Sequence, residues 1–296
     1  MPKALVLGGA TGLVGQALTC VLAKRGWQVE TLGRANGNPL DMAFLKERLT
    51  RVNADTVFNA TAWTRVDEAE DHAEEALLLN RTLPGALARI LKALGRGHLV
   101  HFSTDFVFSG PRQTPWREDD LPNPVSVYGR TKLAGEQAVL EVLPDRACVV
   151  RTAWLFGPGR QSFVDAILAQ CRRKDTISVV HDQTGSPTYS LDLADWSVSL
   201  AERNATGLWH AVNGGGASWR DLAREAIALT AGPCRVEPIA ADQWPQKAKR
   251  PVYSVLDTSK LSALLGKKPR PWPQALRDFL WSGRRLDANG GEEGPS

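Results

Sequence analysis

A tyrosine and a lysine stand four positions apart in the segment VSVYGRTKLAGE, residues 125–136. Positions i and i+4 of a helix lie on one face, so a helix here directs Tyr128 and Lys132 into the same cleft. A lysine ammonium beside a phenol stabilises the phenolate, and we expect it to lower the pKa of Tyr128 so that the hydroxyl transfers a proton near neutral pH. The pair therefore predicts proton-transfer chemistry, although an ordinary surface pair on a helix has the same spacing.

A second polar group follows the apolar run 98–103, where the segment HFSTDFVFSG places Ser103, Thr104 and Asp105 in a row. Side chains at the carboxyl end of a parallel strand face the ligand cleft of such sheets. Thr104 is placed to donate a hydrogen bond to a substrate carbonyl and to stabilise the developing alkoxide. The alternative is a threonine that only forms a turn or caps a helix.

A glycine turn, GGATGLVG, joins the apolar run 3–7 to a helical pattern that ends at Gly26. Gly9, Gly12 and Gly15 allow backbone amides and a helix N-terminus to approach a pyrophosphate, which predicts a dinucleotide site. Arg34 stands where many NAD-binding units have an acidic residue, and a guanidinium there pairs with a 2′-phosphate. NADPH is therefore the favoured cofactor and NADH the alternative, while Asp41 either accepts from the adenine or caps the next helix.

Apolar strands alternate with helical patterns up to residue 152, which predicts an α/β protein with a Rossmann-type, doubly wound parallel sheet. Within this region we expect one helix to span 68–78. Beyond it we expect a helix over 162–173, a strand over 176–180, a loop over 181–188 and a helix over 191–203. The expected division is an NADPH-binding domain (1–153 and 186–213), a smaller C-terminal α/β substrate domain (154–185 and 214–283) and a disordered tail (284–296).

Composition narrows the class of protein further. The 296 residues are 43% apolar and 23% charged, with no apolar run near the roughly 18 residues of a membrane span. The N-terminus enters the glycine turn directly, which leaves no room for a signal peptide and predicts a cytoplasmic protein. The net charge is +4, and the basic clusters 247–250 and 267–271 lack interleaved aromatic residues, so no nucleic acid or membrane partner is expected.

Four cysteines, Cys20, Cys148, Cys171 and Cys234, lie far apart in the sequence. They form no CxxC pair, and no histidine stands at zinc-finger spacing, so we expect no metal site. We also expect all four to be reduced thiols in or near the core.

Several segments together resemble the extended short-chain dehydrogenases and, among them, the dTDP-4-dehydrorhamnose reductase family. The resemblance runs from about residue 3 to residue 281, and is carried by the glycine turn and by NATAWTRVDEAE, FSTDFVFSG, PNPVSVYGRTKLAGE, RTAWLFG, DQTGSPT, GLWHAVNGG and KRPVYSVLDTSKL. It implies NADPH-dependent reduction of the C4 ketone of a dTDP-linked 4-keto-6-deoxy sugar, dTDP-4-dehydro-6-deoxy-L-mannose, to dTDP-L-rhamnose.

The resemblance also implies roles for individual residues. Tyr128 is similar to the proton donor, Lys132 to its partner and ribose ligand, and Thr104 to the hydroxyl that orients the carbonyl. The cofactor contacts expected are Gly9, Gly12, Leu13, Val14, Arg34, Asp41, Met42, Ala60, Thr61, Ala62, Tyr128 and Lys132. The substrate contacts expected are Val66, Thr104, Asp105, Trp154 and Gln183.

Alternatives remain open within the resemblance. Trp63 and Tyr253 depart from the family pattern, which leaves room for a ketoreductase of another dTDP-deoxysugar. The regulatory subunit of methionine adenosyltransferase is also similar to this family and keeps the tyrosine and lysine, so a non-catalytic NADP-binding subunit is the other reading. A dehydratase is disfavoured because Phe106 stands where those enzymes have glutamate. A homodimer is compatible with the sequence and not fixed by it.

Overall fold

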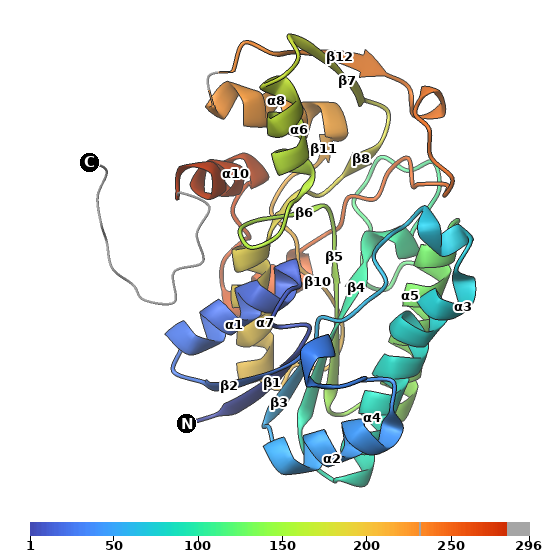
Figure 1. Ribbon diagram of the computed structural model, residues 1–296, viewed down its shortest axis with the longest axis vertical. Coiled ribbons are helices and arrows are strands. Elements are labelled where there is room, and N and C mark those ends of the chain that lie inside the picture. Colours follow the sequence, from blue (N-terminus) through green and yellow to red (C-terminus); the bar gives the residue numbers. More distant parts are fainter. Residues whose placement is uncertain (231, 283–296) are drawn as a thin grey trace.

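The structure is a computed structural model that describes residues 1–230 and 232–282, and a six-stranded parallel sheet forms its lower half in Figure 1. The strand order is β2-β1-β3-β4-β5-β10. Its strands are β1 (Lys3–Leu7), β2 (Gln28–Leu32), β3 (Thr56–Asn59), β4 (His98–Thr104), β5 (Ala147–Thr152) and β10 (Gly207–His210). The chain order reverses beside β1, because β2 pairs on one side of it and β3 on the other. Ligands of such sheets bind at this point, outside the carboxyl ends of the strands.

Helices cover both faces of the sheet, as the doubly wound prediction requires. The α-helices are α1 (Leu13–Lys24), α2 (Met42–Val52), α3 (Ala73–Leu77), α4 (Leu83–Ala93), α5 (Val127–Val142), α6 (Phe163–Cys171), α7 (Ser190–Glu202), α8 (Trp219–Leu229), α9 (Ser259–Leu265) and α10 (Trp272–Trp281). Helices α1 and α7 pack on one face, and α2, α4 and α5 pack on the other. The predicted fold class is therefore confirmed.

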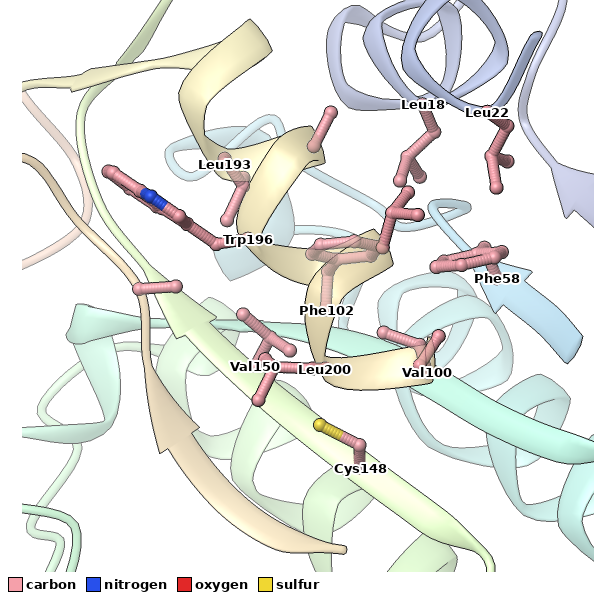
Figure 2. Packing of buried hydrophobic residues seen from close by; sticks show 14 of the residues in the cluster. Leu18, Leu22, Phe58, Val100, Phe102, Cys148, Val150, Leu193, Trp196 and Leu200 are labelled. Carbon is pink, nitrogen blue, oxygen red and sulfur yellow. The ribbon is translucent and has the colours of Figure 1, made fainter. Parts of the chain in front are cut away.

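The core beneath α1 and α7 is formed by large apolar side chains (Figure 2). Leu18 and Leu22 of α1 belong to one buried cluster with Trp196 of α7 and the sheet residues Phe58 and Phe102. Leu18, Leu22 and Phe58 are fully buried. Burying one such side chain contributes roughly 1.5–3 kcal/mol relative to exposure, so this layer fixes where α1, and the glycine turn before it, sit over the sheet.

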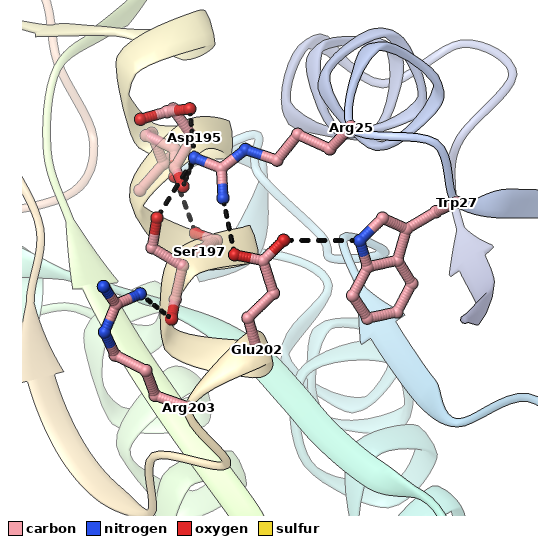
Figure 3. A network of polar contacts seen from close by, with 8 residues as sticks. Arg25, Trp27, Asp195, Ser197, Glu202 and Arg203 are labelled. Atoms are coloured by element: carbon pink, nitrogen blue, oxygen red, sulfur yellow. Dashed lines mark hydrogen bonds and ion pairs between the residues drawn. The ribbon is translucent and has the colours of Figure 1, made fainter. Parts of the chain in front are cut away.

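A polar network ties the end of α1 to α7 at the edge of this core (Figure 3). Arg25 donates to Glu202 at 2.8 Å and also pairs with Asp195. Trp27 donates to the same Glu202 carboxylate at 3.5 Å. Because these groups are partly exposed, we expect the network to add specificity of packing more than stability.

Two segments, 155–189 and 217–281, supply a second group of elements above the carboxyl edge of the sheet (Figure 1). Strands β7 (Thr176–Val180) and β12 (Arg235–Ile239) pair in parallel. The remaining strands are β6 (Leu155–Phe156), β8 (Thr184–Gly185), β9 (Thr188–Tyr189) and β11 (Ala217–Ser218). Helices α6, α8 and α10 share an apolar cluster with these strands that contains Phe156, Tyr189 and Phe279.

Two predicted elements differ from the structure. The helix expected over 68–78 is broken into a 3-10 helix, Glu68–Glu70, and α3, and a π-helical turn, Leu78–Thr82, joins α3 to α4. The carboxylates of Asp67 and Glu70 accept hydrogen bonds from distant backbone amides, and these contacts compete with a continuous helix. The loop expected over 181–188 contains β8 and β9, because β11 and β6 supply partners that the local sequence does not reveal. Other 3-10 helices are Arg34–Asn36, Asp105–Val107 and Ala241–Gln243.

The prediction that all four cysteines are reduced is wrong for two of them. Cys171 at the end of α6 forms a disulfide with Cys234, which immediately precedes β12. These residues meet because β12 pairs with β7, the strand that follows α6. Cys20 and Cys148 are free and buried, as expected.

Within residues 1–230 and 232–282, none of the helices combines the length and the apolar character needed to cross a bilayer. The tail predicted to be disordered, 284–296, lies outside the described residues, as does residue 283 at the end of the expected substrate domain.

Candidate active site

The glycine turn lies at the point where the strand order reverses. Gly8 donates from its amide to the Leu32 carbonyl of β2 at 2.8 Å, and Ala60 donates to the Leu7 carbonyl of β1 at 3.1 Å. Gly12 is the N-cap of α1 and has no side chain to satisfy the first-turn amides of Leu13 and Val14. The first-turn amides of a helix lack intrahelical acceptors, so this end of α1 suits a pyrophosphate.

Close packing explains why the turn needs glycine at Gly15. A Cβ at Gly15 would lie 2.2 Å from the Gly8 carbonyl oxygen, a backbone atom that cannot give way without moving the turn. The first turn of α1 therefore lies directly on the residues that follow β1.

Substituting Gly15 by alanine tests this packing. We expect Gly15→Ala to lower the free energy of unfolding by about 1–3 kcal/mol, because the added methyl group displaces α1 from the turn. NADPH affinity should fall about tenfold with it, corresponding to about 1.4 kcal/mol. Chemical denaturation and fluorescence titration measure the two effects. The control is Gly232→Ala, whose Cβ meets the Ile227 side chain at an ordinary 3.4 Å; equal effects of both substitutions would contradict the packing account.

The other predicted cofactor residues surround the same edge of the sheet. Ala60, Thr61 and Ala62 directly follow β3 and are half-buried. Asp41 caps α2, since its carboxylate accepts from the amides of Ala43 at 2.9 Å and Phe44 at 3.2 Å. Of the two roles that the sequence allowed for Asp41, the structure therefore shows the cap.

Two further predicted cofactor residues lie near this edge. Met42, the first residue of α2, is 40% exposed. Arg34 begins a 3-10 helix directly after β2, and its side chain lies outside the described part of the chain. The 2′-phosphate contact expected of Arg34 therefore stays a prediction.

The catalytic helix α5 is anchored at its first residues. Ser126 caps the helix by accepting from the Gly129 amide at 3.1 Å, and Glu70 accepts from the Val127 amide at 2.8 Å. A Cβ at Gly129 would lie 2.3 Å from the Phe106 carbonyl oxygen, so only glycine lets α5 pack this closely on the end of β4. These contacts set Tyr128 beside Thr104.

Tyr128, Thr104 and Asp105 form one polar group. The Thr104 side chain lies beside the Tyr128 hydroxyl, close enough to oppose in part the rise in the pKa of Tyr128. Thr104 donates to Asp105 Oδ1 at 3.1 Å, and Ser254 donates to Asp105 Oδ2 at 2.5 Å. Burial raises the pKa of Asp105 to about 6, although hydrogen bonds from Ser254 and Thr104 oppose the rise. The sequence prediction that Thr104 and Tyr128 share a site is therefore supported by this placement.

The prediction that the pKa of Tyr128 is lowered is wrong, because the described residues raise this pKa. Burial raises the pKa of Tyr128 to about 12, the Thr104 hydrogen bond lowers it in part, and the Asp105 carboxylate raises it further. Lys132 instead donates from Nζ to the Phe102 carbonyl of β4 at 2.5 Å. Spacing alone places both side chains on one face of a helix but does not fix where the ammonium goes. At neutral pH the phenol therefore holds its proton, as a donor requires.

Lys132 is almost completely buried, with 2% of its surface exposed. Burial lowers the pKa of its ammonium to about 8, and the nearby Glu136 carboxylate opposes this shift. Buried His101 is a second titratable group near Lys132, and burial together with the lysine charge lowers the pKa of His101 well below its usual value. The Lys132 ammonium is therefore shielded from solvent and hydrogen-bonded to protein, one helical turn from Tyr128.

Glu136, one turn further along α5, belongs to a buried ion pair. Arg151 of β5 donates to its carboxylate from Nε at 2.9 Å and from Nη2 at 2.6 Å. Ser103, the residue before Thr104, donates to the same carboxylate at 2.5 Å. The pair fixes α5 to the ends of β4 and β5, and so fixes the distance between Tyr128 and Thr104.

The predicted substrate residues lie partly beside Tyr128 and partly around a cavity next to Trp219. Asp105 belongs to the polar group of Tyr128. Trp154 stacks on Trp219 with ring centroids 3.5 Å apart, and its φ of 45° is unusual for a bulky residue. Gln183 is buried and, with Trp219, lines a cavity of about 300 Å³. Val66 is half-buried in the loop between β3 and the 3-10 helix Glu68–Glu70.

Backbone contacts connect the two places. The Thr184 amide donates to the Val252 carbonyl at 2.8 Å, and the Ser254 amide donates to the Thr184 carbonyl at 2.8 Å. The segment 252–254 thus joins the loop of Gln183 to Asp105. The distance between the cavity and the polar group is therefore set by hydrogen-bonded backbone.

Sequence reasoning missed several residues of the site: Glu70, Glu136, Arg151 and Ser254. One signal was available for Glu136, which lies four positions after Lys132 and therefore on the same face of α5. Ser254 lies in KRPVYSVLDTSKL, one of the segments that carried the resemblance. Glu70 and Arg151 also lie in such segments, NATAWTRVDEAE and RTAWLFG, but their partners lie on other elements and so no role could be read for them.

A parallel doubly wound sheet, a glycine turn at its switch point and a Tyr-x-x-x-Lys helix beside the end of β4 define an extended short-chain dehydrogenase/reductase. Within that class, the chain belongs to the family described as the RmlD substrate binding domain, whose model matches residues 3–285.

Known members of the family show how close the likeness is. A dTDP-4-dehydrorhamnose reductase of Streptomyces griseus is 42% identical over 283 residues, which cover 94% of this chain and 92% of that protein. A dTDP-4-keto-6-deoxy-D-glucose reductase of Streptomyces niveus is 39% identical over 252 residues, covering 84% of this chain and 86% of that protein. The structure of a dTDP-4-dehydrorhamnose reductase of Bacillus anthracis in complex with NADP superposes with a TM-score of 0.90 at 28% identity, covering 95% of this chain and 100% of that one.

Proposed function

We propose that the protein reduces the C4 ketone of dTDP-4-dehydro-6-deoxy-L-mannose (dTDP-4-dehydrorhamnose) with NADPH and releases dTDP-L-rhamnose. The observation that carries the proposal is the placement of Tyr128 beside Thr104 and Asp105 at the end of β4. In a chain of this family it supplies a proton donor and an orienting hydroxyl where a keto sugar would meet the cofactor. The likeness to reductases named for this reaction supports the choice of substrate.

The cofactor fits the residues around the switch point. Gly12 and the amides of Leu13 and Val14 would hold its pyrophosphate, Ala60 and Ala62 would line its path, and Arg34 would contact the 2′-phosphate. The NADP bound to the Bacillus anthracis relative supports this choice over NADH. When bound, NADPH supplies the hydride that adds to the sugar C4 carbon.

The protein's own residues supply the proton that the reduced carbonyl oxygen needs. When substrate binds, the Thr104 hydroxyl would turn from Asp105 Oδ1 and donate to the carbonyl oxygen, which orients it. Tyr128 gives its proton to that oxygen as negative charge develops there. An alkoxide is a stronger base than a phenolate, so a phenol with a pKa of about 12 still transfers its proton. Lys132, one helical turn away and hydrogen-bonded to the Phe102 carbonyl, would bind the nicotinamide ribose. Trp154 and Val66 would line the sugar pocket with Asp105.

A second candidate is the ketoreductase of another dTDP-linked deoxysugar. The observation that favours it is the Streptomyces niveus reductase, which acts on a different dTDP-4-keto sugar and is almost as similar as the rhamnose enzyme. Both candidates use the same proton donor and differ in the sugar that the pocket accepts.

A substrate panel separates the candidates. We expect purified protein to oxidise NADPH fastest with dTDP-4-dehydrorhamnose, more slowly with dTDP-4-keto-6-deoxy-D-glucose, and more slowly again when NADH replaces NADPH. NMR of the products identifies the sugar and its C4 configuration. Preference for another keto sugar would favour the second candidate, and cofactor binding without turnover of any of them would favour a non-catalytic subunit.

We further propose that residues 1–153 and 186–213 bind the cofactor while 154–185 and 214–283 bind the sugar nucleotide. The two apolar clusters on the faces of the parallel sheet and the separate cluster around Phe156 support this division. We place the reaction in the cytoplasm, where reduced cofactor and nucleotide sugars are available. The homodimer stays a prediction.

A further inference from the structure

Two loops from distant parts of the chain meet at Asp67. This carboxylate lies after β3, and its Oδ1 accepts from the backbone amides of Lys247 at 3.0 Å and Ala248 at 2.9 Å. The Arg250 guanidinium donates to Oδ1 at 3.1 Å and to Oδ2 at 2.7 Å. In Figure 1 the orange segment that follows β12 descends to this loop. The basic cluster 247–250 is therefore bound to the loop that follows β3 of the parallel sheet.

The charge of Asp67 is maintained by these contacts. Burial by itself would raise the pKa of Asp67, but the Arg250 hydrogen bond and the amides of Ala248 and Lys247 outweigh it and hold the pKa below its usual value. The carboxylate is therefore ionised throughout the neutral range, and the ion pair with Arg250 is a constant feature there. Side-chain exposures of 43% for Asp67 and 21% for Arg250 show that the pair is only partly shielded from solvent.

The loop that binds Asp67, residues 244–250, forms one wall of the cavity of about 300 Å³. Arg250 lines this cavity and donates to Gln246 Oε1 at 2.8 Å, so Asp67 orients both side chains. The rest of the wall includes aliphatic side chains and a set of flat aromatic and amide groups, namely Phe163, Trp219, Trp244, Gln170 and Gln183. Aromatic faces suit a planar heterocycle, side-chain amides match the donors and acceptors of a pyrimidine base, and a guanidinium matches a phosphate.

We propose that Asp67 is a positioning residue for the nucleotide end of the substrate: it holds Gln246 and Arg250 in the wall of a cavity that binds the pyrimidine nucleotide. The inference rests on the proposed function, because it assigns a place to the dTDP group of the sugar nucleotide. The backbone hydrogen bonds through 252–254 connect this cavity to Asp105. The keto sugar attached to the nucleotide is thereby directed toward Tyr128.

Binding of dTDP tests the role of Asp67 without turnover. Asp67→Asn keeps a side-chain acceptor for the two amides but removes the charge that holds Arg250. We expect Asp67→Asn to weaken dTDP binding about tenfold in calorimetry, the scale of one hydrogen bond to a charged group. The KM of the sugar nucleotide should rise by a similar factor, while kcat and NADPH affinity stay within about twofold of wild type.

The matched control is Asp71→Asn, which makes the same change in charge four residues away and breaks only the exposed pair between Asp71 and Lys247. It should leave dTDP affinity unchanged. Wild-type affinity in Asp67→Asn would overturn the inference, and so would parallel losses of dTDP affinity, NADPH affinity and thermal stability, which indicate a merely structural residue. Failure of wild-type protein to bind dTDP would also overturn it. A different result would contradict the proposed function alone: wild-type protein that binds dTDP but does not reduce any dTDP-keto sugar.

Discussion

Replacing Tyr128 by phenylalanine should lower kcat for ketone reduction by about 10² or more, the usual contribution of a general acid. The substitution removes one oxygen atom and leaves the ring in place against Phe106, whose centroid lies 5.5 Å away. The developing alkoxide then loses its proton donor, and Thr104 loses its hydroxyl neighbour. NADPH affinity should change by no more than about threefold, because the pyrophosphate site lies on α1 rather than α5. Steady-state kinetics and a cofactor titration measure the two quantities.

The matched control is Tyr189→Phe, which removes the same atom from another buried tyrosine. Tyr189 precedes α7, and its ring lies against Phe156 and Phe279, away from the catalytic helix. We expect its kcat to stay within about twofold of wild type, as for most substitutions away from reacting groups. A Tyr128→Phe enzyme that retains wild-type turnover would contradict the assignment of the proton donor.

Replacing Arg151 by methionine should lower the free energy of unfolding by about 3–5 kcal/mol, because it leaves the Glu136 carboxylate buried without its counter-charge. Both side chains are almost fully enclosed, with exposures of 2% and 3%. Arg151 also lies over the Phe108 ring, 4.9 Å from its centroid, so methionine recovers only part of the lost contact. Urea denaturation followed by circular dichroism measures the loss.

Two further variants show whether the loss of stability comes from a buried, unpaired charge or from the loss of any ion pair. Arg25→Met breaks the partly exposed pairs with Asp195 and Glu202 and should cost only about 1 kcal/mol or less. In the double variant Arg151→Met with Glu136→Leu, no charge is left buried, and most of the stability should return. If the double variant is as unstable as Arg151→Met, the loss comes from packing and not from an unpaired carboxylate.

The parts of the fold that depend on local sequence were predictable. The run 3–7, the glycine turn and the helix after it occur in direct succession, so strand, turn and helix follow from periodicity and the conformational needs of glycine. Tyr128 and Lys132 were placed on one helical face by spacing alone. Thr104 was found because it ends an apolar run, and the carboxyl ends of parallel strands form the ligand edge.

The rest depends on contacts between residues far apart in the chain. Asp67 and Arg250 are 183 positions apart, and Cys171 and Cys234 are 63 apart. Such pairs are set by how α/β elements pack, which no single-segment pattern records. The pKa of Tyr128 was predicted with the wrong sign for the same reason: the lysine is near in sequence, but burial and Asp105 dominate in space. Local patterns predicted Thr104, Tyr128 and Lys132, whereas their protonation and their partners Glu136, Arg151 and Ser254 depend on tertiary structure.

The measurement that tests the account most directly is transfer of label from deuterated NADPH. Protein and dTDP-4-dehydrorhamnose are incubated with NADPH that carries deuterium at both hydrogen positions of the nicotinamide C4, and the product is examined by NMR. The account predicts dTDP-L-rhamnose with one deuterium on the sugar C4 carbon, and almost no labelled product from Tyr128→Phe over the same time. Unlabelled product, label at another sugar carbon, or undiminished labelling by Tyr128→Phe would contradict it.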